Sequence, residues 1–93
     1  SCLNALARTS ETDLQAAHEQ ARQEAVESDL DSGSLFRAEA SLDDAQAIWT
    51  RYRDAECTRP GPLMFVSESS REEIILDCQI GLDRARASEL LEH

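Results

Sequence analysis

The chain contains no lysine, few aromatic residues and no long hydrophobic run. Because a membrane-spanning helix needs about 20 apolar residues in succession, no such span is expected. The sequence also lacks a Gly-rich phosphate loop, a Cys-x-x-Cys metal spacing and a serine or cysteine with a recognisable base. His18 is the only histidine before the C-terminal residue. We therefore expect no enzyme activity, no cofactor and no metal site.

The charge of the chain is strongly one-sided. Nine arginines oppose nineteen Asp and Glu residues, which leaves a formal net charge of −10 at pH 7 and a pI near 4.4. Such a field repels nucleic acid and anionic lipid and attracts cationic proteins. The alternative is that the acidity only keeps the protein soluble. We expect a cationic protein partner and no nucleic acid.

Length and cysteine content limit the fold. A chain of 93 residues buries only about 60 to 65% of its unfolded surface, so a covalent staple would help a thin core. Three cysteines without metal spacing are typical of one disulfide and one leftover thiol, which favours an oxidising compartment such as the bacterial periplasm. The chain begins at Ser1-Cys2, so we expect the mature or trimmed form of a protein secreted through a signal peptide.

The spacing of apolar residues predicts an all-α fold, a three-helix array or hairpin bundle, without strands. The first helix is expected over 10–29, starting at the capping box Ser10-x-x-Asp13, and Gly33 is expected to supply the turn that follows. The second helix is expected over 34–57 with Ser34 as its N-cap, and Ser41 is an alternative start. Its predicted buried stripe is Leu35, Ala38, Leu42, Ala45, Trp49 and Tyr52, widened by Phe36 and Ile48.

Two prolines are expected to end the second helix and keep the chain extended at 60–62. Leu63 to Val66 then form a short apolar loop, which either folds back as a lid on the core or exposes Met64 and Phe65 to a partner. The third helix is expected over 70–90 from the box Ser70-x-x-Glu73. Its predicted buried residues are Ile74 or Ile75, Cys78, Leu82 and Ala85, and Gly81 suggests close approach of another backbone.

Several residues together resemble the lysozyme inhibitor LprI-like family of small bacterial envelope proteins. The pattern is Ala-Gln-x-x-Trp, then Arg-Asp-Ala-x-Cys, then a loop and a Cys followed by Leu, Arg and Leu. It is formed here by Ala45, Gln46, Trp49, Arg53, Asp54, Ala55, Cys57, Cys78, Leu82, Arg86 and Leu90. Before residue 42 the resemblance is thin: Cys2, Thr9 and Asp13-Leu14 match the family's opening, but Ala17 stands where its second cysteine falls.

The resemblance implies a disulfide between Cys57 and Cys78, and closing a loop of this length is worth about 3 kcal/mol on the chain-entropy model. The alternative is a pair of reduced, buried cysteines in a cytosolic protein. Cys2 is left as a free thiol, an intermolecular link or the acylated cysteine of a lipoprotein, that is, a lipid anchor. The native domain is expected to span 1–90, because the ending 91–93 matches the start of a vector-encoded histidine tag.

Roles for the other motif residues follow from their positions. Trp49 and Tyr52 are expected to be core anchors rather than binding residues. Gln46 is expected to bond between helices, with a ligand contact as the alternative. Arg53 and Arg86 are expected to pair with carboxylates across the second and third helices, with a solvated face as the alternative.

The resemblance implies a periplasmic or envelope-anchored protein that binds a cationic lysozyme and blocks its substrate cleft. The residues expected to contact this partner are Asp54, Glu56, Met64, Phe65 and Glu68. The alternatives are an immunity protein against a secreted toxin and a structural or accessory module of the envelope, because fold resemblance alone does not carry function.

Overall fold

The computed structural model describes residues 2–92, which form three long helices and one helical turn: α1 (Cys2–Ser32), α2 (Ala38–Thr58), α3 (Pro60–Leu63) and α4 (Glu68–Leu91). No strand occurs in these residues. The expected all-α array of three helices is confirmed, and α3 is a short addition to it.

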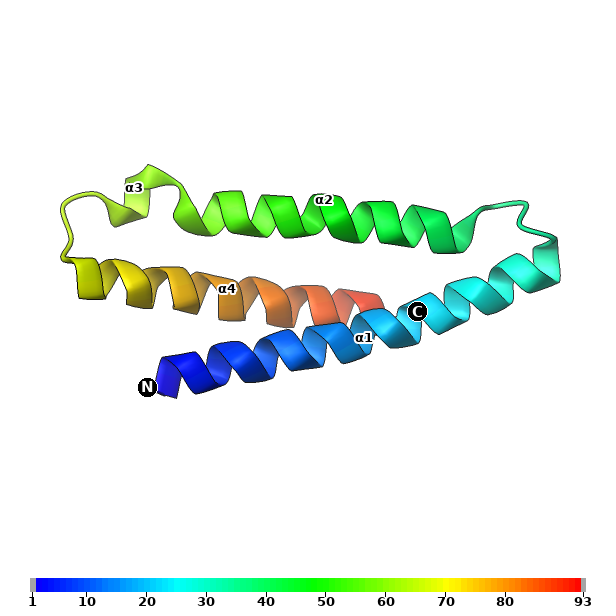
Figure 1. Cartoon of the computed structure of the whole chain (residues 1–93), viewed down its shortest axis with the longest axis horizontal. Helices are drawn as coiled ribbons and strands as arrows, with labels where there is room; N and C mark the ends of the chain where they lie inside the picture. Colours follow the sequence, from blue (N-terminus) through cyan, green and yellow to red (C-terminus); the bar gives the residue numbers. More distant parts are fainter. Residues whose placement is uncertain (1, 93) are drawn as a thin grey trace.

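The three long helices lie side by side in an elongated molecule of 54 × 24 × 15 Å (Figure 1). α1 and α4 run in the same direction, and α2 runs antiparallel to both (Figure 1). α4 packs more extensively on α1 than on α2. It ends near the middle of α1, so the last turns of α1 and the start of α2 extend beyond it (Figure 1). We call this projection, residues 24–41, the distal arm.

The hydrophobic core is small and sits where the three long helices meet. Leu14, Ala17 and Leu90 form its buried cluster. The partly buried side chains packed against this cluster are Ala21, Leu42, Trp49 and Ala87. Short alanine side chains let the helices approach closely but bury little apolar area each, so the core alone contributes modest stability.

A row of side-chain links joins α2 to α4, and we call it the α2–α4 seam. Arg86 Nε donates to Gln46 Oε1 at 3.0 Å, and Arg53 Nη1 lies 3.1 Å from Asp83 Oδ1. Cys57 and Cys78 are joined by a disulfide with their Cα atoms 5.5 Å apart, as expected. Because the helices are antiparallel, these links fix one register along most of the length of α2.

α1 is longer than expected because the residues before Ser10 continue the helix. Leu and Ala dominate 3–7 and favour helix, so the capping box predicted at Ser10 is wrong. Ser10 is instead buried inside α1, where its hydroxyl donates to the Ala7 carbonyl at 3.0 Å. Cys2 is free and exposed on the first turn.

α2 begins at Ala38, so both predicted starts, Ser34 and Ser41, are wrong. The cap comes from α1: the Asp29 carboxylate accepts hydrogen bonds from the backbone N–H groups of Ala38 at 2.7 Å and Glu39 at 3.1 Å. Gly33 takes the expected left-handed conformation in the turn, with φ of 64°. Ser34, at φ of 62°, belongs to the same turn.

The prolines and serines that follow α2 also act differently from the expectation. Pro60 starts the helical turn α3 instead of an extended segment, because a proline suits the first helical position, where its missing N–H costs nothing. α4 begins before the predicted Ser70, since Ser67 is its N-cap and accepts from the Ser70 N–H at 3.2 Å. Gly81 has no neighbour within 4 Å of where a Cβ would stand, so the predicted close approach is wrong.

The buried face of α2 is rotated from the predicted stripe. Tyr52 is 54% exposed and Ala45 is exposed, so neither is a core residue. Ile48 is exposed as well, whereas Trp49 packs against the core as the stripe predicts. Gln46 and Arg53 face α4. On α4 the predicted Ala85 is exposed, and the buried residues are Ile80, Asp83 and Leu90. The polar partners across the seam, which apolar spacing does not record, set this rotation.

We predict that replacing Cys57 and Cys78 together with serine lowers the free energy of unfolding by about 3 kcal/mol, because the open chain gains loop entropy. Urea unfolding followed by circular dichroism measures this loss. Cys2→Ser is the control and should leave stability unchanged. Mass spectrometry of a non-reduced digest that found Cys2 linked to either partner would contradict the assignment.

We predict that Asp83→Asn destabilises the protein by about 3 kcal/mol, since it leaves the Arg53 charge largely buried without its interhelical partner. Asp77→Asn, on the exposed face of the same helix, is the matched control and should have little effect. A combined Arg53→Met and Asp83→Leu variant should recover much of the loss, because it removes both charges at once. Equal losses in Asp83→Asn and the control would show that the pair contributes nothing.

Candidate functional site

Five residues of the sequence motif lie in the α2–α4 seam: Gln46, Arg53, Cys57, Cys78 and Arg86. The Arg53 guanidinium stands 5.5 Å from the centre of the Trp49 ring, contacts Asp83, and binds Asp54 at 2.9 Å. Burial opposes the charged form of Arg53, but the hydrogen bonds and charges of Asp54 and Asp83 outweigh it and raise the pKa of Arg53 above its ordinary value. This group therefore stays cationic and holds two helices together rather than presenting chemistry to a ligand.

Arg86 has a similar position further along the seam. It binds Gln46 on α2 and pairs with Glu89 on its own helix. Tyr52, in contrast, lies on the outer face of α2. The structure therefore places Gln46, Arg53 and Arg86 between helices and leaves Tyr52 in solvent.

The single histidine of the described residues, His18, lies on α1, apart from the α2–α4 seam. His18 Nε2 is buried without a hydrogen bond, and the nearest carboxylate oxygen, on Asp43, is 3.9 Å away, too far for one. Among residues 2–92 no group of three or more His, Cys, Asp or Glu side chains is placed to hold a metal ion. None of the described helices has the length and apolar character to cross a membrane.

One exposed apolar surface is the loop between α3 and α4, which we call the proximal tip, residues 63–68. Phe65 is 98% exposed and has a φ of 65°, a strained conformation for a bulky residue that carries its ring away from the core. Met64 is also exposed, whereas Leu63 and Val66 are half-buried. The loop as a whole is therefore no lid, and the alternative of an exposed tip is the one observed.

The acidic residues expected beside this tip are largely neutralised. Asp54 binds Arg53, and Glu56 binds Arg59 at 2.9 Å, both near the end of α2. Glu68 stands exposed on the first turn of α4 with no ion pair among the described residues. Of the expected contact residues, Met64, Phe65 and Glu68 are thus free to meet a partner, while Asp54 and Glu56 already have one.

A second exposed apolar surface lies at the opposite end, on the distal arm. Leu30 is 77% exposed, Leu35 73% and Phe36 71%. Sequence reasoning missed this surface because it placed Leu35 and Phe36 on the buried side of the second helix. The sequence feature that could have revealed this surface is the pair of large apolar residues just after Gly33. They lie outside α2 because this helix begins at Ala38, four positions after the predicted start.

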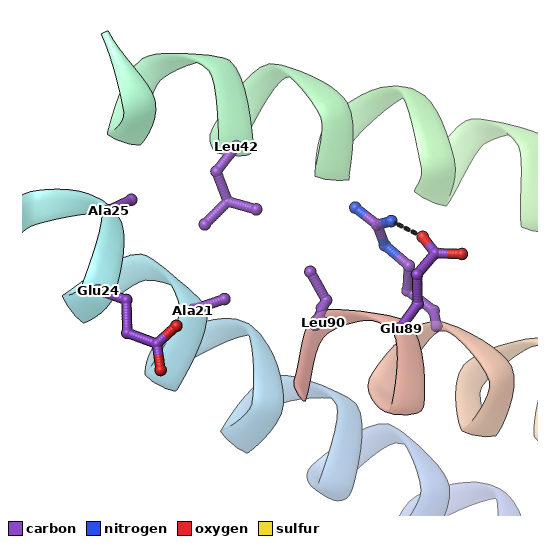
Figure 2. Close-up of a pocket in the computed structure, with 7 residues that line it drawn as sticks. Ala21, Glu24, Ala25, Leu42, Glu89 and Leu90 are labelled. Atoms are coloured by element: carbon purple, nitrogen blue, oxygen red, sulfur yellow. Dashed lines mark hydrogen bonds and ion pairs between the residues drawn. The ribbon is translucent and has the colours of Figure 1, made fainter. Parts of the chain in front are cut away.

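A hollow of about 370 Å³ opens where α4 ends against α1 and α2 (Figure 2). Leu42 points into it from α2, facing Ala21 on α1 and Leu90 on α4 (Figure 2). The other lining residues are Glu24, Ala25, Arg86 and Glu89. The hollow is an open notch, apolar at its floor and charged at its rim, and it adjoins the distal arm.

Comparison with models of protein families shows which family the chain resembles. The family model described as "Lysozyme inhibitor LprI" matches residues 1–90, nearly the whole chain. No curated protein and no solved structure matches the chain significantly.

We predict that Asp29→Ala loosens the distal arm, because it removes the acceptor of two N–H groups at the start of α2. The expected cost is about 1 kcal/mol of stability, with faster hydrogen exchange at the amides of Ala38 and Glu39. Asp31→Ala, two residues away and exposed, is the control. Unchanged exchange at both amides in Asp29→Ala would show that the carboxylate does not cap α2.

Proposed function

The chain belongs to the lysozyme inhibitor LprI family, and from this premise we propose that it binds a cationic lysozyme in the bacterial periplasm or envelope and blocks the enzyme's substrate cleft. The family match over residues 1–90 is the observation that carries the proposal. Binding rather than catalysis is the mode of action, because the seam residues are engaged with one another and both ends of the molecule expose large apolar side chains.

Charge supports this choice of partner. The formal charge of −10 attracts a basic protein over long range and raises its rate of encounter. Lysozymes act on an anionic polymer and tend to be basic, so the charges of inhibitor and enzyme are complementary. Exposed apolar side chains then supply the short-range part of the affinity, since buried aromatic anchors dominate most protein interfaces.

For the contact surface we propose the proximal tip, with Phe65 and Met64 as anchors and Glu68 as the charged neighbour. Asp54 and Glu56 contribute mainly to the general acidic field, because Arg53 and Arg59 already neutralise them. A narrow tip with a ring in full solvent suits a concave partner such as an enzyme cleft.

We predict that the protein slows the lysis of a bacterial cell-wall suspension by a basic lysozyme, and that the inhibition weakens as salt rises. Exposed charges are screened over about 8 Å at physiological ionic strength, so the steering should fade between low and moderate salt. Turbidity decay measures inhibition, and calorimetry at two salt concentrations measures affinity. Phe65→Ser should weaken binding at least about fivefold without changing the melting temperature, because this side chain packs on nothing.

Two results would contradict the proposal in different ways. Unchanged lysis and undetectable binding with several lysozyme types at low salt would reject the function and favour an immunity or accessory role. Tight binding that Phe65→Ser and Glu68→Gln leave intact would keep the function and reject the proximal tip as its surface.

A further inference from the structure

We propose that the distal arm is a second docking surface, distinct from the proximal tip, and that it fits a cationic protein with an apolar hollow. The inference rests on the proposed binding of a cationic partner, and it assigns to that binding a surface at the other end of the molecule. Three observations carry it: the exposed apolar residues of the arm, the way in which the turn is held, and the distribution of charge.

The apolar residues of the arm stand on a fixed turn. Leu30 lies in the last turn of α1, and Leu35 and Phe36 lie in the turn that connects α1 to α2. The Asp29 carboxylate clamps the start of α2, and the Asp29 carbonyl accepts from the Ser34 N–H at 2.7 Å. A surface that is already ordered loses little conformational entropy on binding. Burying its apolar side chains therefore contributes more to the binding free energy than it would on a flexible loop.

The turn also keeps strained backbone at two non-glycine positions. Ser34 has a φ of 62° and Arg37 a φ of 49°, conformations that disfavour most side chains. They place Leu35 and Phe36 outside the helix, where both are exposed, rather than on its buried face. As a result, Leu35 and Phe36 are not buried, although both residues directly precede α2 in the sequence.

The charge of the arm suits a cationic partner. The arm, residues 24–41, carries five carboxylates and one arginine. Asp29 is used as a cap and Glu39 pairs with Arg22 at 2.7 Å. The remaining three, Glu24, Glu27 and Asp31, are exposed and have no ion pair among residues 2–92. These three free carboxylates attract a cationic protein to the arm.

The notch at the end of α4 extends this surface toward the middle of the molecule. Its floor is apolar, and Glu24 on its rim belongs to the arm (Figure 2). α4 also ends there, and the carbonyl groups at a helix C-terminus carry partial negative charge. A lysine or arginine side chain of the partner, with an apolar stem and a cationic head, matches both features.

The test compares matched pairs of surface variants at the two ends. Leu35→Ser with Phe36→Ser alters the arm, and Met64→Ser with Phe65→Ser alters the proximal tip; all four side chains are exposed, so folding should be unaffected. Glu27→Gln with Asp31→Asn removes free charge from the arm, and Glu72→Gln with Asp77→Asn is its control on α4. Binding is measured by calorimetry to a basic lysozyme and, separately, to cytochrome c as a basic protein unrelated to lysozymes.

We expect the apolar arm variant to weaken binding of lysozyme about tenfold or more. The charge variant of the arm should slow association and reduce the salt dependence, and its control on α4 should do so less. Loss in both the arm and the proximal-tip variants supports two docking surfaces. Wild-type affinity in both arm variants, with loss only at the proximal tip, overturns the inference and leaves the proposed function intact.

Cytochrome c separates the two proposals further. If lysozyme does not bind but cytochrome c binds and loses affinity in the arm variants, the proposed function fails while the arm remains a docking surface for cationic proteins. If neither protein binds wild type at low salt, both proposals fail.

Discussion

The ion pair between Arg53 and Asp83 is the interaction on which the register of the whole molecule depends. Both side chains are mostly withdrawn from water, so each is costly to bury unless the other is opposite it. Any slip of α4 along α2 separates the two charges, and the same slip strains the disulfide and breaks the contact between Gln46 and Arg86. A core made of a few leucines and alanines has little shape of its own to select one register, so polar and covalent links select it here.

Once the register is fixed, the lengths of the helices determine which apolar side chains remain exposed. α4 ends at Leu91, next to the core, while α1 and α2 continue to their own turn (Figure 1). Two helices side by side have only one contact face, so their remaining apolar residues have nothing to pack on. No third helix among residues 2–92 covers this part of the molecule, so Leu30, Leu35, Phe36 and the adjoining notch stay exposed.

Much of the fold was predictable from local chemistry. The helical spacing, the turn at Gly33, the end of α2 before Pro60 and the cysteine pair all follow from residues close together in the sequence or from the family pattern. The errors come from contacts between distant residues. No local motif reveals that Asp29 caps a helix nine residues later, and so Ser34 was the predicted cap.

The same limit applies to the buried face of α2. Apolar spacing favours Tyr52 over Arg53 for burial, and only the presence of Asp83 on the facing helix reverses the choice. Of the candidate site, the apolar character of Met64 and Phe65 was evident in the sequence, but their exposure was not, because spacing cannot tell a lid from an exposed tip. The distal arm was missed altogether, since its existence depends on where a different helix ends.

The disulfide joins α2 to α4 and leaves α1 outside the cross-link. α1 is held only by noncovalent contacts: its packing on α4, the hydrogen bonds from the start of α2 to Asp29, and the surface ion pairs of Arg22 with Glu39 and Asp43. The molecule therefore consists of a cross-linked hairpin, α2 and α4, and a helix, α1, that no covalent cross-link holds. Because α1 supplies two of the three residues of the buried cluster, Leu14 and Ala17, its dissociation exposes the core, and α1 of another copy can then bind there. Exchange of α1 between molecules, a domain swap, is the form of self-association that this connectivity favours.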